Sequence, residues 1–126
     1  MKGQAMSDTR QVLEEAFKVI FGTPPTLSYE DWQDGNFTPE HRRFNRFRRF
    51  LDAEAWTDAA MMLLDRTRWR ILSLHETEVE DAPPFEIRLG QRGAGFGRAR
   101  IVHGTGETEA LALAQACLKA RENADG

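Results

Sequence analysis

Apolar residues in the first half of the chain recur at the three- and four-residue spacing of amphipathic helices. One such run predicts a helix over residues 8–21, with Ser7 as its N-terminal cap and Gly22 at its end. A second helix is expected to begin at Thr38-Pro39, because a capping hydroxyl followed by proline is typical of a first helical turn.

The second helix contains the run HRRFNRFRRFL, residues 41–51, with five arginines and three phenylalanines. At about 100° per residue its apolar residues share one side of the helix, namely Phe44, Phe47, Phe50 and Leu51. A stripe of three arginines, Arg42, Arg46 and Arg49, falls on the opposite side. Asp52 is expected to cap a third helix, in which the shared face is formed by Trp56, Ala59, Ala60 and Leu63.

Beyond Arg68 the apolar positions alternate with a period of two, which indicates β-strands over 68–76, 84–90 and 97–104. The second strand alternates Phe85, Ile87 and Leu89 with charged residues, and the third alternates Ala99 and Ile101 with arginines. In the first strand both alternating sets are partly apolar, which predicts a sheet covered at least partly on both faces.

The stretch ETEALALAQACLKAREN predicts a final helix by its helix-forming residues. Thr105 is its expected cap, and Ala110, Ala114 and Cys117 form a side of small residues that could lie close against the sheet. Residues 122–126 are expected to form a tail.

These elements predict an α+β fold built on a three-stranded antiparallel sheet. Residues 53–121 supply a core of the order α-β-β-β-α, and residues 1–52 form an extension with two N-terminal helices that pack on this core. A length of 126 residues suits a single domain.

The composition is that of a soluble protein, with 40 % apolar and 29 % charged residues and a net charge of −3. No apolar run reaches the roughly 20 residues of a membrane span, so a membrane is not an expected partner. The first ten residues lack the apolar centre of a signal peptide, and the lone Cys117 fits a reducing compartment. A cytoplasmic location is therefore expected.

Charge is distributed in blocks, which define three candidate partner-binding surfaces. The first is the arginine stripe, Arg42, Arg46 and Arg49. The second is the hairpin between the last two strands, with Arg92, Phe96, Arg98 and Arg100. The third is the acidic link after the first strand, with Glu76, Glu78, Glu80 and Asp81.

Each surface has a functional and a purely structural interpretation. The stripe could meet an acidic protein surface or phosphates, pair with the acidic link inside the molecule, or be a solvated face. The hairpin could stack on bases, anchor a protein interface, or be an exposed face of the sheet. The acidic link could imitate the phosphates of a nucleic acid or be a solvated loop.

Signatures of catalysis and of metal binding are absent from the sequence. His41, His75 and His103 are scattered, and no Gly-x-Ser-x-Gly motif or paired-cysteine motif occurs. Cys117 lies among alanine and leucine and is expected to be packed rather than nucleophilic. We therefore expect no catalytic residue, metal or cofactor, and no enzymatic activity.

Three segments, DAAMMLLDRTRWRI, FEIRLG and GTGETEALALAQACLKA, together resemble the phage α/β/α (ABA) sandwich domain family over about residues 53–121. The resemblance implies a phage or prophage origin and no known reaction. The order α-β-β-β-α is also similar to that of double-stranded-RNA-binding domains. In that family lysines at the start of the last helix hold phosphates, whereas this chain has Glu107 and Glu109 there.

The resulting expectation is a non-enzymatic phage or prophage accessory protein that binds a host protein complex in the host cytoplasm and inhibits host defence, as anti-CRISPR proteins do. The alternative is a nucleic-acid-binding module that uses the arginine-rich helix and hairpin. A third possibility is a structural component of the virion.

Overall fold

The computed structural model describes residues 2–23, 35, 38–78, 80–92 and 100–125, with only the backbone for 2–7 and 123–125. In chain order the elements are α1 (Lys2–Phe21), α3 (Pro39–Asp52), α4 (Trp56–Met61), β1 (Trp69–Glu76), β2 (Phe85–Gln91), β3 (Ile101–Gly106) and α5 (Glu109–Asp125). The predicted α+β class, the order α-β-β-β-α and the preceding helices are confirmed.

The three strands form one antiparallel sheet in the order β1-β2-β3. The register places Val102 opposite Leu89 and Gly104 opposite Ile87. These residues share the buried inner face of the sheet, together with Phe85. A bulge between Ile71 and Ser73 shifts the pairing of β1 with β2.

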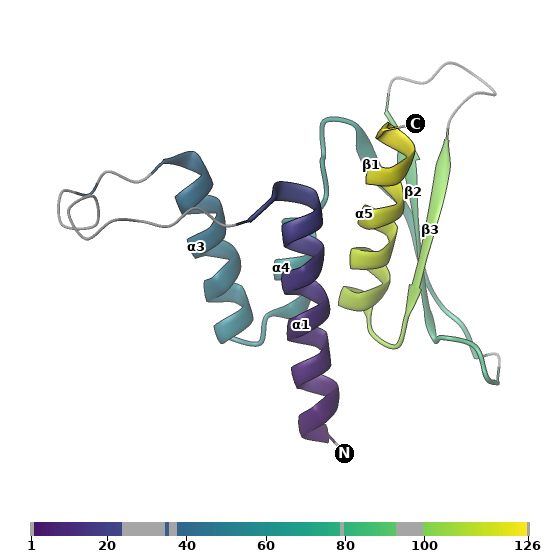
Figure 1. The fold of residues 1–126 in the computed structure, drawn as a ribbon. Helices are drawn as coiled ribbons and strands as arrows, with labels where there is room; N and C mark the ends of the chain where they lie inside the picture. Colours follow the sequence, from purple (N-terminus) through teal and green to yellow (C-terminus); the bar gives the residue numbers. More distant parts are fainter. Residues whose placement is uncertain (1, 24–34, 36–37, 79, 93–99, 126) are drawn as a thin grey trace.

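The elements stack in layers from the sheet outward, as Figure 1 shows. Helix α5 lies on the inner face over β2 and β3, and α1 and α4 pack on the far side of α5. Helix α3 is outermost and contacts α4, while its aromatic rings meet Phe17 of α1. The N-terminal helices thus pack on the core through α5 and α4.

Helix α5 approaches the sheet closely because β3 presents glycine to it. A Cβ on Gly104 would collide with the carbonyl oxygen of Ala112 and the amide nitrogen of Ala116, and a Cβ on Gly106 would lie 2.7 Å from the amide nitrogen of Ala112. Ala112 and Ala116 are thus the small residues nearest β3.

The small residues that we expected against the sheet lie on the opposite side of α5. By helical spacing Ala110, Ala114 and Cys117 fall about 150° from Ala112 and Ala116. They are buried nevertheless, because α1 and α4 cover that side of the helix. The helix is therefore packed on two sides.

Helix α1 begins at Lys2, so Ser7 lies inside the helix and does not cap it, contrary to expectation. Its C-terminal end is as predicted: Gly22 has a φ of 84°, and its amide donates to the Lys18 carbonyl at 2.8 Å. Glycine adopts this left-handed conformation without steric cost, and this favours its place after the last helical residue.

Thr38 caps α3 as predicted. Its Oγ1 accepts from the His41 amide at 3.2 Å, and the His41 Nδ1 accepts from the Thr38 amide at 3.2 Å. This reciprocal pair places a histidine where a glutamate or glutamine completes a capping box.

Asp52 does not cap the third helix. It is the last residue of α3 and accepts a hydrogen bond from Arg10 of α1 at 3.0 Å. Helix α4 begins after Ala55, which provides no side-chain cap. The Asp52 carboxylate instead links the C-terminal end of α3 to α1.

The cap of α5 is Thr108 rather than the predicted Thr105. The Thr108 Oγ1 accepts from the Leu111 amide at 3.2 Å, whereas Thr105 donates its amide and its hydroxyl to Gln115 Oε1. The helical backbone continues through 122–125, which we had expected to form a tail.

The other face of the sheet is open among the described residues, contrary to the predicted cover on both faces (Figure 1). Leu72 lies over Gly90 on this face and stays 42 % exposed. Ile101, which alternates with arginines in the sequence, pairs with Gly90 and is 50 % exposed, while Val102 is buried in the core. Two adjacent apolar residues had left the face of β3 ambiguous.

Candidate functional site

The arginine stripe of α3 lies where the sequence predicts it. Phe47 and Leu51 are buried against the other helices, and Phe44 and Phe50 are partly buried beside them. The stripe residues Arg42, Arg46 and Arg49 are exposed on the opposite side of the helix. A single helix therefore joins an apolar anchor to a basic outer surface.

The basic charge of α3 is not neutralised within the described part of the molecule. The helix carries five arginines against two acids, Glu40 and Asp52, and Asp52 is bound by Arg10. None of the five forms an ion pair with a described carboxylate, although Arg43 lies over the Phe21 ring at 4.4 Å and Arg46 lies 5.7 Å from the centroid of the Phe50 ring. This surface can accept an external anion or an acidic surface.

The suggested internal pairing between the stripe and the acidic link is not observed. Helix α3 and the connection between β1 and β2 lie on opposite sides of the molecule, separated by α1, α4 and α5 (Figure 1). Glu76, Glu78, Glu80 and Asp81 are exposed. The acidic link is therefore a separate surface.

The basic hairpin is partly tied to the fold. The Arg92 amide donates to the Arg68 carbonyl at 2.6 Å, and its Nε donates to the Trp69 carbonyl at 3.3 Å. Arg100 is exposed at the start of β3, and its carbonyl accepts from the Gln91 amide. Phe96 and Arg98 lie outside the described residues. The structure thus does not bring Arg92 and Arg100 together with the stripe on α3.

Glu86 and Arg88 on β2 pair with each other, and Nε of Arg88 lies 2.9 Å from Oε1 of Glu86. The hydrogen bond from Arg88 lowers the pKa of the Glu86 carboxyl from its usual value. This arginine is thus neutralised locally, unlike those of α3.

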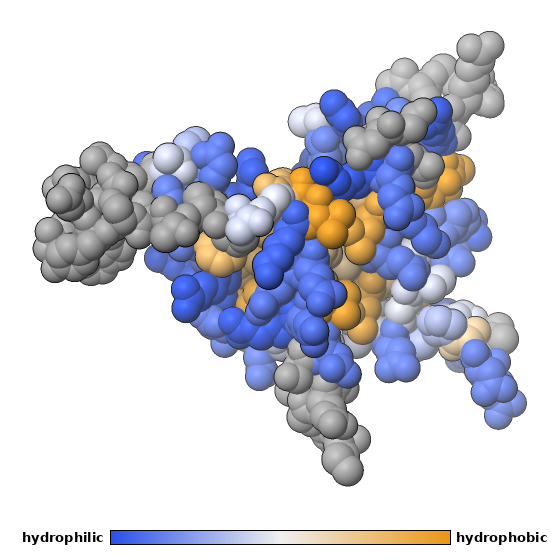
Figure 2. Space-filling model, in the orientation of Figure 1, coloured by the Kyte–Doolittle hydropathy of each residue, from blue (hydrophilic) through white to orange (hydrophobic). Residues whose placement is uncertain are grey.

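A pocket of about 570 Å³ opens between the C-terminal parts of α1 and α5, the first turns of α3 and the connection from α4 to β1. Leu63, Trp69 and Cys117 are its buried apolar residues, and Phe21 and Met62 lie nearer the surface. Figure 2 shows apolar side chains gathered over the C-terminal end of α1, with hydrophilic residues around them.

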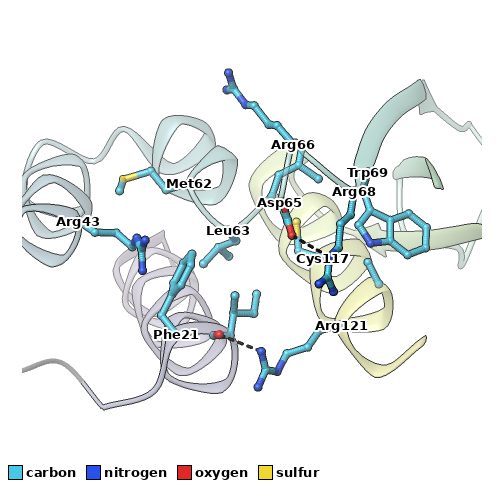
Figure 3. A pocket seen from close by; sticks show the side chains of 13 residues that line it. Phe21, Arg43, Met62, Leu63, Asp65, Arg66, Arg68, Trp69, Cys117 and Arg121 are labelled. Atoms are coloured by element: carbon cyan, nitrogen blue, oxygen red, sulfur yellow. Dashed lines mark hydrogen bonds and ion pairs between the residues drawn. The ribbon is translucent and has the colours of Figure 1, made fainter. Parts of the chain in front are cut away.

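Basic side chains surround this apolar pocket. In Figure 3, Arg43, Arg68 and Arg121 point toward the space between α1 and α5, whereas Arg66 points away from it. Arg121 donates to the Ile20 carbonyl at 2.9 Å, which satisfies one of the free carbonyls at the end of α1. The pocket therefore combines an apolar floor with three guanidinium groups.

Asp65 is the one carboxylate among the described residues that line the pocket. Hydrogen bonds from Thr67, and the charge of Arg68 at 3.8 Å, lower the pKa of its carboxyl. Asp65 is therefore ionised at neutral pH, and the positive charge of the three arginines exceeds its negative charge.

Cys117 lies in the pocket wall and is 4 % exposed. Burial in apolar surroundings raises the pKa of its thiol to about 12. The reactive thiolate is therefore almost absent at neutral pH, as expected for a packed cysteine.

We expect Cys117 to be inert toward thiol reagents while the protein is folded. At about pH 8 its reaction with 5,5′-dithiobis(2-nitrobenzoic acid) should be about a hundredfold slower than in guanidinium chloride, because the thiol is buried and protonated. Absorbance of the released thionitrobenzoate measures both rates, and the C117S variant supplies the blank. A rapid stoichiometric reaction of the native protein would contradict this placement.

Sequence reasoning did not find the pocket, because its lining residues come from four separate segments. Arg43, Arg68 and Arg121 stand far apart in the chain and follow no motif. Only Arg121 carries a local signal, because basic residues are common near the C-terminal end of a helix. Only the fold places them together.

Within the part of the chain that the structure describes, no cluster of histidine, cysteine and carboxylate groups could hold a metal ion. No described helix has the length and apolar character needed to cross a membrane. Comparison with family models, curated proteins and solved structures finds no match for the chain. The resemblance to the phage sandwich domain stays a prediction.

Proposed function

We propose that this chain is a non-enzymatic binding protein that docks the arginine stripe of α3 against an acidic surface of a partner protein. The observation that supports this most directly is the unneutralised charge of α3, whose five exposed arginines have no described carboxylate as ion-pair partner. Arginine is well suited to such contacts because its planar group can bind carboxylates through two hydrogen bonds.

The extent of the stripe favours a protein partner over a nucleic acid. Arg49 lies seven positions after Arg42, so the stripe covers about 10 Å along the helix axis. Three cations over this length would neutralise about three phosphates, which gives weak and salt-sensitive binding. The net charge of −3 and the exposed Glu107 and Glu109 at the start of α5 also disfavour phosphate.

The biological setting of the proposal rests on the resemblance of residues 53–121 to the phage sandwich domain. We infer from it an accessory protein of a phage or prophage that acts in the host cytoplasm on a host protein complex. Inhibition of host defence is the role that we propose for this binding. The arginine stripe lies in α3, outside the segment that carries the resemblance.

Charge reversal of the stripe tests the proposal. The variant R42E/R46E/R49E should capture the partner about tenfold less than the wild type, because attraction to the acidic surface becomes repulsion. Its thermal transition should persist, since these side chains are exposed. The assay is retention of proteins from a nuclease-treated bacterial lysate, with quantitative mass spectrometry of the captured partner.

A variant with the same change in net charge provides the control. R66E/R70E/K119E reverses three exposed basic residues outside α3 and should retain the partner. Equal capture by the stripe variant and the wild type would remove the stripe from the interface. Two results together would favour the nucleic-acid alternative. The chain would retain DNA or RNA, with a retention that falls steeply as the salt concentration rises, and nuclease treatment would remove the captured proteins.

A further inference from the structure

The pocket at the C-terminal ends of α1 and α5 has the size and chemistry of a small-molecule site. Its volume of about 570 Å³ falls within the range of roughly 300–1,000 Å³ that is typical of such sites. Ligand sites commonly combine apolar walls with a few convergent polar groups, and this pocket has both.

The floor of the pocket is apolar and suits an apolar ligand body. Leu63 is 2 % exposed, and Trp69 and Cys117 are also buried, so a ligand that covers them contacts hydrocarbon, an indole ring and a neutral thiol. Phe21 and Met62 can add an aromatic face and a flexible thioether. An ion without an apolar part would leave the exposed ring of Phe21 in contact with water.

The arginines at the pocket keep hydrogen-bond donors free for an anionic group. A guanidinium has five N–H donors. Arg121 gives one of its nitrogens to the Ile20 carbonyl, and Arg43 lies over the Phe21 ring without an ion pair to a carboxylate of the described residues. The contact of Arg68 with Asp65 is long, 3.8 Å, and its side chain is 66 % exposed. All three can therefore turn donors toward one ligand.

We propose that this pocket binds a small amphipathic organic anion, with a carboxylate, phosphate or sulfonate group on an aromatic or aliphatic body. The head group is held by Arg43, Arg68 and Arg121, and the body covers Leu63 and Trp69. Among the described residues that line the pocket, three guanidinium groups face the space and Asp65 is the one carboxylate, which favours an anion. The site differs from the proposed docking surface, because Arg43 lies on the flank of α3 rather than in the stripe.

Such a ligand would connect parts of the fold that the chain itself joins only through packing. Arg43 belongs to α3, Arg68 lies just before β1, and Arg121 belongs to α5. An anion held by all three ties the outermost helix to the central helix and the sheet. Binding would therefore raise the Tm of the whole chain.

The probe for this site is 8-anilinonaphthalene-1-sulfonate, an aromatic body with one sulfonate, and its uncharged counterpart is N-phenyl-1-naphthylamine. We expect fluorescence titration of the full chain to show saturable binding, with one molecule of the charged probe bound per chain. The uncharged compound should bind about tenfold more weakly, because it lacks charge-assisted hydrogen bonds to the arginines. Near-ultraviolet circular dichroism verifies that the protein stays folded.

Single variants locate the bound probe. R43Q and R121Q should each weaken sulfonate binding about tenfold, and R48Q, an exposed arginine of α3 that does not line the pocket, should leave it unchanged. If loss of the Ile20 contact unfolds R121Q, the R43Q variant decides the test, because Arg43 is exposed and its contact with the described residues is the one over the Phe21 ring.

Three results would each overturn the proposal. One is the absence of saturable binding, and another is equal affinity for the charged and uncharged probes. The third is a sulfonate affinity that R43Q and R48Q change equally, which would indicate general attraction to a basic surface. The stripe variant R42E/R46E/R49E keeps all three pocket arginines, so failure of partner capture and failure of pocket binding are distinguishable.

Discussion

Replacing Gly104 by alanine is expected to lower the free energy of unfolding by about 3 kcal/mol. A Cβ there would collide with backbone atoms of α5, the carbonyl oxygen of Ala112 and the amide nitrogen of Ala116. Backbone cannot rotate away as a side chain can, so α5 would have to move off β3. Urea denaturation followed by far-ultraviolet circular dichroism would measure the loss, and Tm should fall by about 10 °C.

Gly90→Ala is a matched control, since it is the same substitution in the same sheet. Its new Cβ would meet the side chain of Leu72, with Cδ1 at 2.8 Å and Cγ at 3.0 Å. This exposed side chain can turn outward, so we expect a loss below about 1 kcal/mol. Both variants restrict the unfolded chain equally. Equal losses would therefore contradict a close approach of α5 at Gly104 specifically.

The sequence predicts the orientation of an element correctly where one side of that element is apolar and the other is charged. In α3 the phenylalanines lie on one side of the helix and the stripe arginines on the other. In β2 isoleucine and leucine alternate with charged residues. Each of these elements meets the core on one side and solvent on the other, so the pattern reports its orientation. The exposed stripe of α3 and the buried Ile87 and Leu89 are confirmed.

The orientation of α5 could not be obtained in this way, because the helix is covered on two sides. Small and apolar residues occur almost all round it, which indicates a buried helix but gives no preferred face. Ala110, Ala114 and Cys117 look as suitable for close packing as Ala112 and Ala116. The deciding information lies in β3, where Gly104 lacks the Cβ that would keep the backbone of α5 away from the sheet.

Local capping signals succeeded or failed according to whether another partner competed for the side chain. The other side-chain contacts of Thr38, with Glu40 and His41, lie within the first turn of α3, and Thr38 caps this helix. Asp52 binds Arg10, and Thr105 binds Gln115, so neither caps the helix that follows it. These partners stand 42 and 10 residues away in the chain. Such contacts arise only once the helices have packed.

Truncation of Phe47 to alanine is expected to destabilise the protein by about 3–5 kcal/mol. The side chain is 1 % exposed, and its ring stacks on Phe17 of α1 with 4.5 Å between the ring centroids. Removing it leaves a cavity where α3 meets α1. Urea denaturation should show a single transition at a lower midpoint, with an unchanged slope, if α3 unfolds together with the rest of the chain.

Phe44→Ala is the comparison for this variant, because Phe44 belongs to the same helix but is only partly buried. Its ring lies 5.8 Å from that of Phe17, and we expect a loss of about 1–2 kcal/mol. A loss below about 1 kcal/mol for Phe47→Ala would show that α3 is not held by the core. The expected result instead supports a rigidly held helix. Because such a helix is already ordered, binding of a partner to its arginine stripe would cost little conformational entropy.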